Sequence, residues 1–183
     1  MYGLVNKGLQ EILTARFGEA TWLKIKAHAG VTDELFISSE SYPDEVTDEL
    51  VAAANCITLT PVDELLFGFG EYWVMQTGRI SYGALFDAAG KTVPDFLRNL
   101  PNFHTRVKMM FPKLEPPRFR VESITDSSLE LHYLTHRPGF TEFVRGVISG
   151  LGRSFRTEVQ CSLTASKAKG ADHDVFMIKW KGP

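Results

Sequence analysis

Cysteine is scarce in this chain, which has only Cys56 and Cys161 among its 183 residues. The two stand in unrelated contexts without a CxxC pair, so the sequence offers neither a disulfide framework nor a zinc-cysteine site, and both are expected to be small core residues. Long apolar runs are also missing, since no stretch approaches the roughly 18 residues that a membrane span needs. The N-terminus lacks a basic region followed by an apolar one. These absences predict a cytoplasmic protein without a membrane partner.

An excess of one charge is lacking as well. The formal net charge is -2 at pH 7, and no block of Lys and Arg interrupts the sequence. A nucleic-acid partner needs a basic patch, so this class of partner is disfavoured. Aromatic residues, in contrast, are plentiful, with 13 Phe, 5 Tyr and 3 Trp. They provide the material to line a pocket for a flat ligand.

The spacing of apolar residues is helical over about 1–112. Val5, Leu9 and Ile12 recur at intervals of three and four residues, which is typical of an amphipathic helix. Thr60 is expected to be the N-cap of a later helix, because a proline and an acidic residue follow it closely. The first part of the chain is therefore expected to be helical.

Over about 113–183 the apolar residues alternate instead, which predicts antiparallel strands joined by polar turns. The expected strands are 118–124, 128–137, 157–166 and 173–180, with one helix at 140–155. The sequence predicts an α+β fold in a single domain, 1–183, in which a helical part is followed by a four-stranded antiparallel sheet with one inserted helix.

One histidine interrupts the apolar face of a predicted helix. That face holds Leu97, Leu100, His104, Val107 and Phe111. Pro101 lies within this stretch and predicts a kink or a restart of the helix just before the histidine. A histidine on an apolar face is most often a core residue bonded to a backbone carbonyl, so this position alone leaves a structural role open beside a ligand role.

One face of the second predicted strand changes from apolar to polar along its length. Alternate residues share one side of a strand, and here they are Leu129, Leu131, Tyr133, Thr135 and Arg137. Two hydroxyl donors and a guanidinium can bind one or two carboxylates. A strand that simply ends in solvent would also carry apolar residues first and polar residues last, so this alternative stays open. Together with His104, this face favours a haem, whose iron takes an imidazole and whose edge carries two propionates.

These residues, with the runs "MYGLVNK", "FGEYW", "NFHTRV", "EPPRF", "LELHYLTHR" and "DHDVFMIKW", resemble the H-NOX family. Its members are haem-nitric oxide/oxygen binding domains related to the haem domain of soluble guanylate cyclase, and the chain looks most similar to their stand-alone cyanobacterial-type bacterial members. The resemblance covers nearly the whole chain. It implies a haem b with His104 as its iron ligand. It also implies a propionate clamp of Tyr133, Thr135 and Arg137, with threonine in place of the family's serine.

The resemblance implies further contacts with the haem. Pro117 matches the proline that presses on the haem and distorts it. Met1 and Val5 belong to an N-terminal helix that packs on the side of the iron-binding histidine.

On the other side of the haem, the resemblance implies contacts from Trp73, Phe143 and Val147. Phe143 stands where oxygen-binding members carry a tyrosine, and a one-residue difference in length makes Glu142 the other candidate for that place. Neither is a phenol. The indole N–H of Trp73 could donate weakly if it points inward, although a Trp that only packs is the simpler interpretation. Because bound O2 needs a hydrogen-bond donor whereas NO and CO do not, the resemblance implies binding of NO and CO and exclusion of O2.

The implied function is gas sensing without catalysis. NO is expected to weaken the bond between iron and His104 and to shift the helical part relative to the sheet. The signal is expected to pass in trans to a histidine kinase or a cyclic-di-GMP enzyme. Two alternatives stay open. One is a haem enzyme that turns over peroxide, which needs a distal acid–base group, and the other is a carrier of an apolar carboxylate held by Arg137.

Several other polar residues are expected to lie in solvent. His132 and His136 alternate with the clamp and so face the opposite side of the sheet. The acidic and histidine residues of 172–174 predict a solvated turn rather than a metal site. Gly68 and Gly70 indicate a close approach either to a porphyrin or to another helix.

Overall fold

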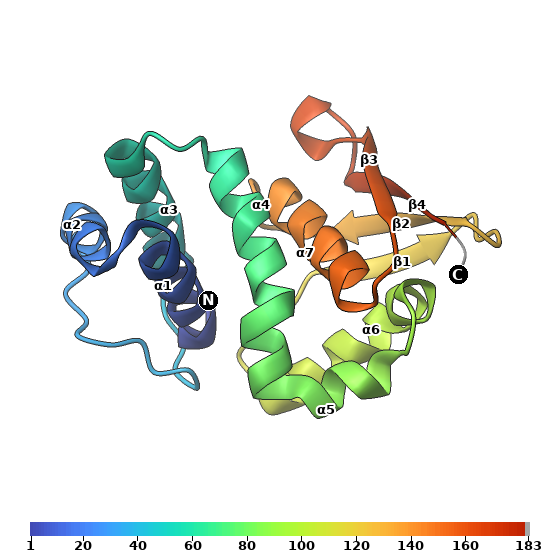
Figure 1. Cartoon of the computed structure of the whole chain (residues 1–183), viewed down its shortest axis with the longest axis horizontal. Helices are drawn as coiled ribbons and strands as arrows, with labels where there is room; N and C mark the ends of the chain where they lie inside the picture. The colour runs from blue at the N-terminus through green and yellow to red at the C-terminus, as the bar shows by residue number, and fades with distance from the viewer. Residues whose placement is uncertain (182–183) are drawn as a thin grey trace.

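The computed structural model describes residues 1–181 and has the expected α+β architecture, with a four-stranded sheet in the C-terminal part (Figure 1). The helices are α1 (Gly3–Phe17), α2 (Glu19–His28), α3 (Asp44–Thr58), α4 (Val62–Tyr72), the π-helix η1 (Trp73–Gly78), α5 (Arg79–Ala89), α6 (Val93–Met110), α7 (Thr141–Ser154) and the 3-10 turn η2 (Lys167–Lys169). The strands are β1 (Arg118–Glu122), β2 (Ser128–Leu134), β3 (Val159–Ala165) and β4 (Asp174–Trp180).

The sheet is fully antiparallel, with strand order β1-β2-β4-β3. β2 ends at Leu134 and not at residue 137 as expected. Its neighbours supply the reason, because β1 begins opposite Leu134 and β4 begins opposite Tyr133, so no strand remains to pair with the residues that follow. Thr135 and Arg137 therefore lie in the turn beyond the strand.

The core consists of two apolar clusters. One gathers around Trp22, Leu50 and Phe69, in the part formed by α1 to α4. The other gathers around Phe96 and Phe176, where α5 to α7 cover one face of the sheet. One long helix, formed by α4, η1 and the start of α5, runs down the middle of the molecule between α1–α3 and the sheet, and the rest of α5 turns away at a kink at Tyr82 (Figure 1).

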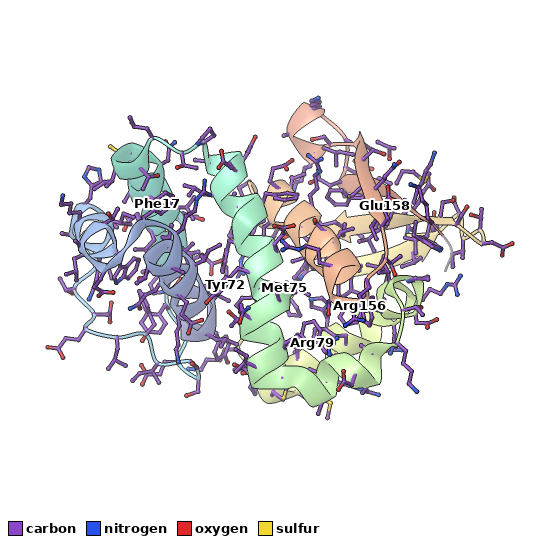
Figure 2. All side chains as sticks on the ribbon, in the orientation of Figure 1. Phe17, Tyr72, Met75, Arg79, Arg156 and Glu158 are labelled. Carbon is purple, nitrogen blue, oxygen red and sulfur yellow. The ribbon has the colours of Figure 1, made fainter. Side chains whose placement is uncertain are left out.

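This long helix changes its winding at η1. Tyr72, Met75 and Arg79 follow one another along its front (Figure 2). The guanidinium of Arg79 donates to the hydroxyl of Ser154 at 3.0 and 3.2 Å, which ties the helix to the end of α7. π-Turns within helices are rare and occur often at functional sites.

Glycines allow α4 and α7 to pack backbone against backbone. A Cβ on Gly70 would lie 2.1 Å from the carbonyl oxygen of Phe143, and one on Gly146 would lie 2.0 Å from that of Phe67. A Cβ on Gly68 would be 3.8 Å from its nearest neighbour, the side chain of Ile12. Gly70 is therefore needed for the close packing of α4 against α7, where a side chain would clash with the backbone of α7.

Three local expectations were wrong. α6 does not restart at Pro101, because the residues before and after the proline belong to one helix that starts at the N-cap Thr92, whose hydroxyl accepts from the N–H of Asp95. The N-cap of α4 is Pro61 instead of Thr60. Cys56 is exposed on α3, whereas Cys161 is half-buried as expected of a core residue.

Two polar residues expected in solvent are buried. His132 is only 9% exposed, because Nε2 of His173 lies 2.8 Å from its Nδ1 and Glu122 lies on its other side. Asp174 is 5% exposed, whereas His136 is exposed as expected. Within residues 1–181, no three His, Cys, Asp or Glu side chains are arranged to hold a metal ion.

No single helix in the described part of the chain has both the length and the apolarity of a membrane span. α3 together with the stretch 62–89 meets the criterion only as a pair that is bent by 117°.

Candidate ligand pocket

A cavity of about 230 Å³ opens between α6, α7, η1, the strands β1 and β2, and the start of α1. Its lining includes all ten residues that the sequence assigned to cofactor contact. They are Met1, Val5, Trp73, His104, Pro117, Tyr133, Thr135, Arg137, Phe143 and Val147. Most of the other lining residues are aliphatic or aromatic.

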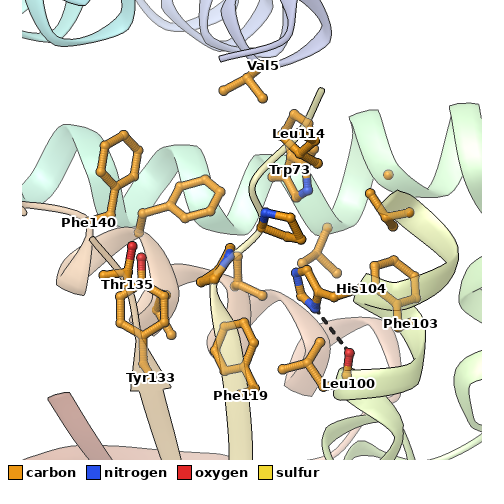
Figure 3. Close-up of a pocket in the computed structure, with 18 of the residues that line it drawn as sticks. Val5, Trp73, Leu100, Phe103, His104, Leu114, Phe119, Tyr133, Thr135 and Phe140 are labelled. Atoms are coloured by element: carbon orange, nitrogen blue, oxygen red, sulfur yellow. Dashed lines mark hydrogen bonds between the residues drawn. The ribbon is translucent and has the colours of Figure 1, made fainter. Parts of the chain in front are cut away.

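α6 places His104 in this lining. Its Nδ1 lies 3.1 Å from the carbonyl oxygen of Leu100, one helical turn earlier (Figure 3). Burial lowers the pKa of His104 more than the hydrogen bond to Leu100 raises it, so the imidazole is neutral at pH 7. An imidazole that donates from Nδ1 to a carbonyl keeps a lone pair on Nε2, which is the tautomer that a metal ligand requires.

Two aromatic residues that the sequence analysis missed also line the cavity. Phe119 on β1 lies between His104 and Tyr133, with ring centroids 5.1 and 5.3 Å away. Its register opposite Tyr133 is the signal that could have identified it. Tyr82 also lines the cavity and packs edge-on against Phe111, just beyond the end of α6.

Tyr133, Thr135 and Arg137 form a polar group at another side of the cavity (Figure 3 shows the first two). Burial raises the pKa of Tyr133, so its phenol remains a donor at neutral pH. The hydroxyl of Thr135 accepts from the N–H of Arg137 at 3.0 Å and fixes the turn that carries the guanidinium.

Asp44, at the start of α3, pairs with the guanidinium of Arg137, with its Oδ2 2.6 Å from Nε. Burial alone would raise the pKa of Asp44, but the N-terminal ammonium of Met1 and the nearby Arg137 lower it overall. Sequence reasoning missed this carboxylate, because 93 residues separate the partners. Arg137 is thus held in place by the helical part of the molecule.

The wall formed by η1 and α7 is apolar. Trp73 and Phe143 pack edge to face, with centroids 6.5 Å apart. Phe143 lines the cavity, whereas Glu142 pairs with Arg145 at 3.0 Å and is not part of the lining. Of the two candidates for this place, the structure brings Phe143 to the pocket.

The chemistry of the lining fits a haem. The ring of a haem is flat and apolar, its iron takes a neutral imidazole, and its propionates take hydroxyl and guanidinium donors. His104 would hold the iron, and Tyr133, Thr135 and Arg137 would hold the propionates.

Solved H-NOX proteins share this fold. The TM-score is 0.91 with the H-NOX protein of S. oneidensis in the Fe(II)NO state, at 17% identity and with 100% of both chains covered. It is 0.86 with the unliganded Fe(II) H-NOX protein of K. algicida, at 22% identity, covering 100% of this chain and 98% of that one. The class of structure is therefore that of the H-NOX proteins.

The sequence comparisons agree with the fold. The chain is 33% identical over 164 residues to the soluble guanylate cyclase gcy-31 of Caenorhabditis elegans, covering 89% of this chain and 23% of that protein. It is 28% identical over 171 residues to gcy-33 of the same organism, covering 93% and 18%. The chain thus spans only about a fifth of the length of these relatives.

The family model described as haem-NO-binding matches residues 2–163, and the chain belongs to this family, the H-NOX domains. H-NOX domains bind haem and act as sensor domains, so this chain is a sensor domain and not an enzyme.

Proposed function

We propose that the chain binds a ferrous haem b in this cavity and senses NO through His104. One observation carries the proposal: a neutral imidazole, fixed at Nδ1 by the carbonyl of Leu100, stands in an otherwise apolar cavity with a hydroxyl and guanidinium group at its edge. This is the arrangement that haem ligation requires.

Each lining residue has a defined part in this proposal. His104 binds the iron through Nε2, and Tyr133, Thr135 and Arg137 hold the propionates. Pro117 presses on the haem from the side of His104. When bound, the ferrous iron supplies the site at which a diatomic gas binds.

The apolar wall supports the choice of gas. A bound O2 takes up negative charge and needs a donor beside it, whereas NO and CO bind ferrous iron in apolar surroundings. Phe143 offers no donor and Glu142 is paired with Arg145, whereas Trp73, packed edge-on against Phe69 and Phe143, has an indole N–H that could donate weakly if it points inward. The pocket is therefore expected to bind NO and CO and to exclude O2.

The output is proposed to arise from α6. A bound haem would supply the iron that NO binds, and a weakened or broken bond from His104 to that iron would let α6 shift against β1, with Pro117 and Val5 as the haem contacts that register the change. H-NOX domains signal to partner domains, and we propose a histidine kinase or a cyclic-di-GMP enzyme acting in trans in the cytoplasm. Residues 1–183 are proposed to fold as one such domain, with the boundary between its parts near residue 112.

An absorption spectrum of the reduced protein tests this function. The haem-loaded protein is recorded unligated, then with NO, with CO and in air. We expect a Soret band that shifts with NO and with CO and that shows no stable oxy form in air. A protein without a Soret band after haem addition would remove the haem assignment and favour a carboxylate carrier. A stable oxy complex would overturn the proposed gas selectivity.

A further inference from the structure

A buried carboxylate lies beside the polar end of the pocket without being part of its lining. Asp174, the first residue of β4, is 5% exposed. Its Oδ2 accepts from the hydroxyl of Thr141 at 2.5 Å, and its Oδ1 accepts from the backbone N–H of Lys167 at 2.7 Å. Because an unsatisfied buried carboxylate is costly, the segments that supply these donors are held in place around it.

The segments held by Asp174 are those that build the pocket. Thr141 is the first residue of α7, the helix that brings Phe143 to the cavity. Lys167 begins η2, and its ammonium donates to the carbonyl oxygen of Thr135 at 2.9 Å. Asp174 itself pairs in register with Tyr133 on β2. One carboxylate therefore connects the apolar wall with the hydroxyl and guanidinium group.

The position of the carboxylate also suits α7. A negative charge near the first turn of a helix interacts favourably with the helix dipole. The N-cap of α7, Phe140, makes no side-chain hydrogen bond, and Asp174 adds a carboxylate at this helix start through Thr141, beside Glu142 of the first turn itself.

We propose that Asp174 is a positioning residue of the ligand pocket, which fixes the start of α7 relative to Tyr133 and Thr135. The inference rests on the proposed haem function, since it assigns Phe143 on α7 and the polar group of Tyr133, Thr135 and Arg137 to contacts with the same haem. Its consequence is that Asp174 controls both the surroundings of the bound gas and the hold on the propionates without touching either.

Two pairs of substitutions separate this role from general stabilisation. Asp174→Asn keeps both contacts, because the amide oxygen can accept from Lys167 while the amide nitrogen donates to the hydroxyl of Thr141, whereas Asp174→Ala removes both. Thr141→Ser keeps the hydroxyl and Thr141→Val removes it. Thr47→Val is the matched control, since Thr47 donates to buried Asn6 at 2.6 Å and neither of these two residues lines the cavity.

Two properties are measured on the haem-loaded protein and one on the protein without haem. The first two are the C–O stretching frequency of the CO complex and the rate of haem transfer to apomyoglobin. The third is hydrogen exchange in the first turn of α7. We expect Asp174→Ala and Thr141→Val to shift the C–O frequency, to speed haem transfer about tenfold and to raise exchange in that turn. Thr141→Ser should stay near the wild type, and Asp174→Asn, which keeps both contacts but loses the negative charge, should fall between the wild type and Asp174→Ala.

The outcomes distinguish the two proposals. If the wild type binds no haem, the proposed function fails. If it binds haem while Asp174→Ala and Thr141→Val leave the C–O frequency and the transfer rate unchanged, or change them only as much as Thr47→Val does, the positioning role is wrong. Should Asp174→Ala not fold, Thr141→Val alone decides, because it leaves the carboxylate bonded to Lys167.

Discussion

The imidazole of His104 packs against the phenyl ring of Phe119, with their centroids 5.1 Å apart. The first residue belongs to α6 and the second to β1, an edge strand of the sheet. The proposed iron ligand is thus also part of the contact between the helical part and the sheet. A displacement of His104 has a direct route to the sheet.

Replacing His104 with glycine should remove the protein's own iron ligand. We expect the His104→Gly protein to lose its Soret band during purification and to regain a five-coordinate spectrum when imidazole is added, because free imidazole can enter the space left by the side chain. The Fe–N(His) stretch by resonance Raman is the measurement. His136→Gly, at an exposed position, should retain the wild-type stretch. An unchanged stretch in His104→Gly would show that another residue binds the iron.

Installing a phenol at residue 143 should create affinity for O2. Phe143→Tyr places a hydroxyl at the apolar wall, where it can donate to bound O2. We expect an oxy complex that persists in air, stabilised by about 1.4 kcal/mol through the new hydrogen bond, where the wild type forms none, and stopped-flow absorption measures its O2 dissociation rate. Glu142→Gln is the control, and since Glu142 pairs with Arg145 outside the lining, it should leave gas binding unchanged. An oxy complex that forms as well in Glu142→Gln as in Phe143→Tyr would contradict the placement of residue 143.

The two thiols should differ strongly in reactivity. Burial raises the pKa of the Cys161 thiol to about 11, so at pH 8 only about one part in a thousand is thiolate, the reactive form. Cys56 is exposed. A disulfide reagent at pH 8 should therefore modify one thiol in the folded protein and two after unfolding. Cys56→Ser should abolish the fast reaction, and a fast reaction that disappears in Cys161→Ser instead would be the opposite result.

The contact between α4 and α7 can be tested with two glycines of one helix. Gly70→Ala should lower the free energy of unfolding by about 1–3 kcal/mol, because its methyl group would meet the carbonyl of Phe143 at 2.1 Å. Gly68→Ala meets nothing closer than 3.8 Å and should raise that free energy by up to about 1 kcal/mol through helix propensity. Urea unfolding measures both, and equal effects would contradict the packing described for Gly70.

Periodicity predicted the fold because each half of the chain buries one face. The helical spacing in the first part and the alternation in the second follow directly from that burial, and β2 presents Leu129, Leu131 and Tyr133 to the interior as the alternation indicated. The position of His104 on an apolar face was predictable for the same reason. The haem-binding roles of His104 and of its neighbours remain predictions.

The remaining features depend on contacts between distant segments. Asp44 meets Arg137 and His173 covers His132 only because the folded chain brings them together, and no local pattern in the sequence records this. Asp174 follows a run of loop residues whose composition indicated a solvated turn. In the folded chain its carboxylate is buried and accepts hydrogen bonds from Thr141 and Lys167. The restart predicted at Pro101 does not occur, since one helix from Val93 to Met110 contains the proline.

The π-helix between Trp73 and Gly78 has a consequence for how the pocket wall tolerates change. A π-turn accommodates one residue more than an α-turn, and each residue of an α-helix accounts for a rotation of about 100° about the axis. Removing the one extra residue would restore regular α-helical winding, whereas each further residue removed or added would rotate everything downstream, Tyr82 included, by about 100°. The orientation of the wall is therefore encoded in segment length, and natural variants should accept exchanges of side chain here far more readily than insertions or deletions.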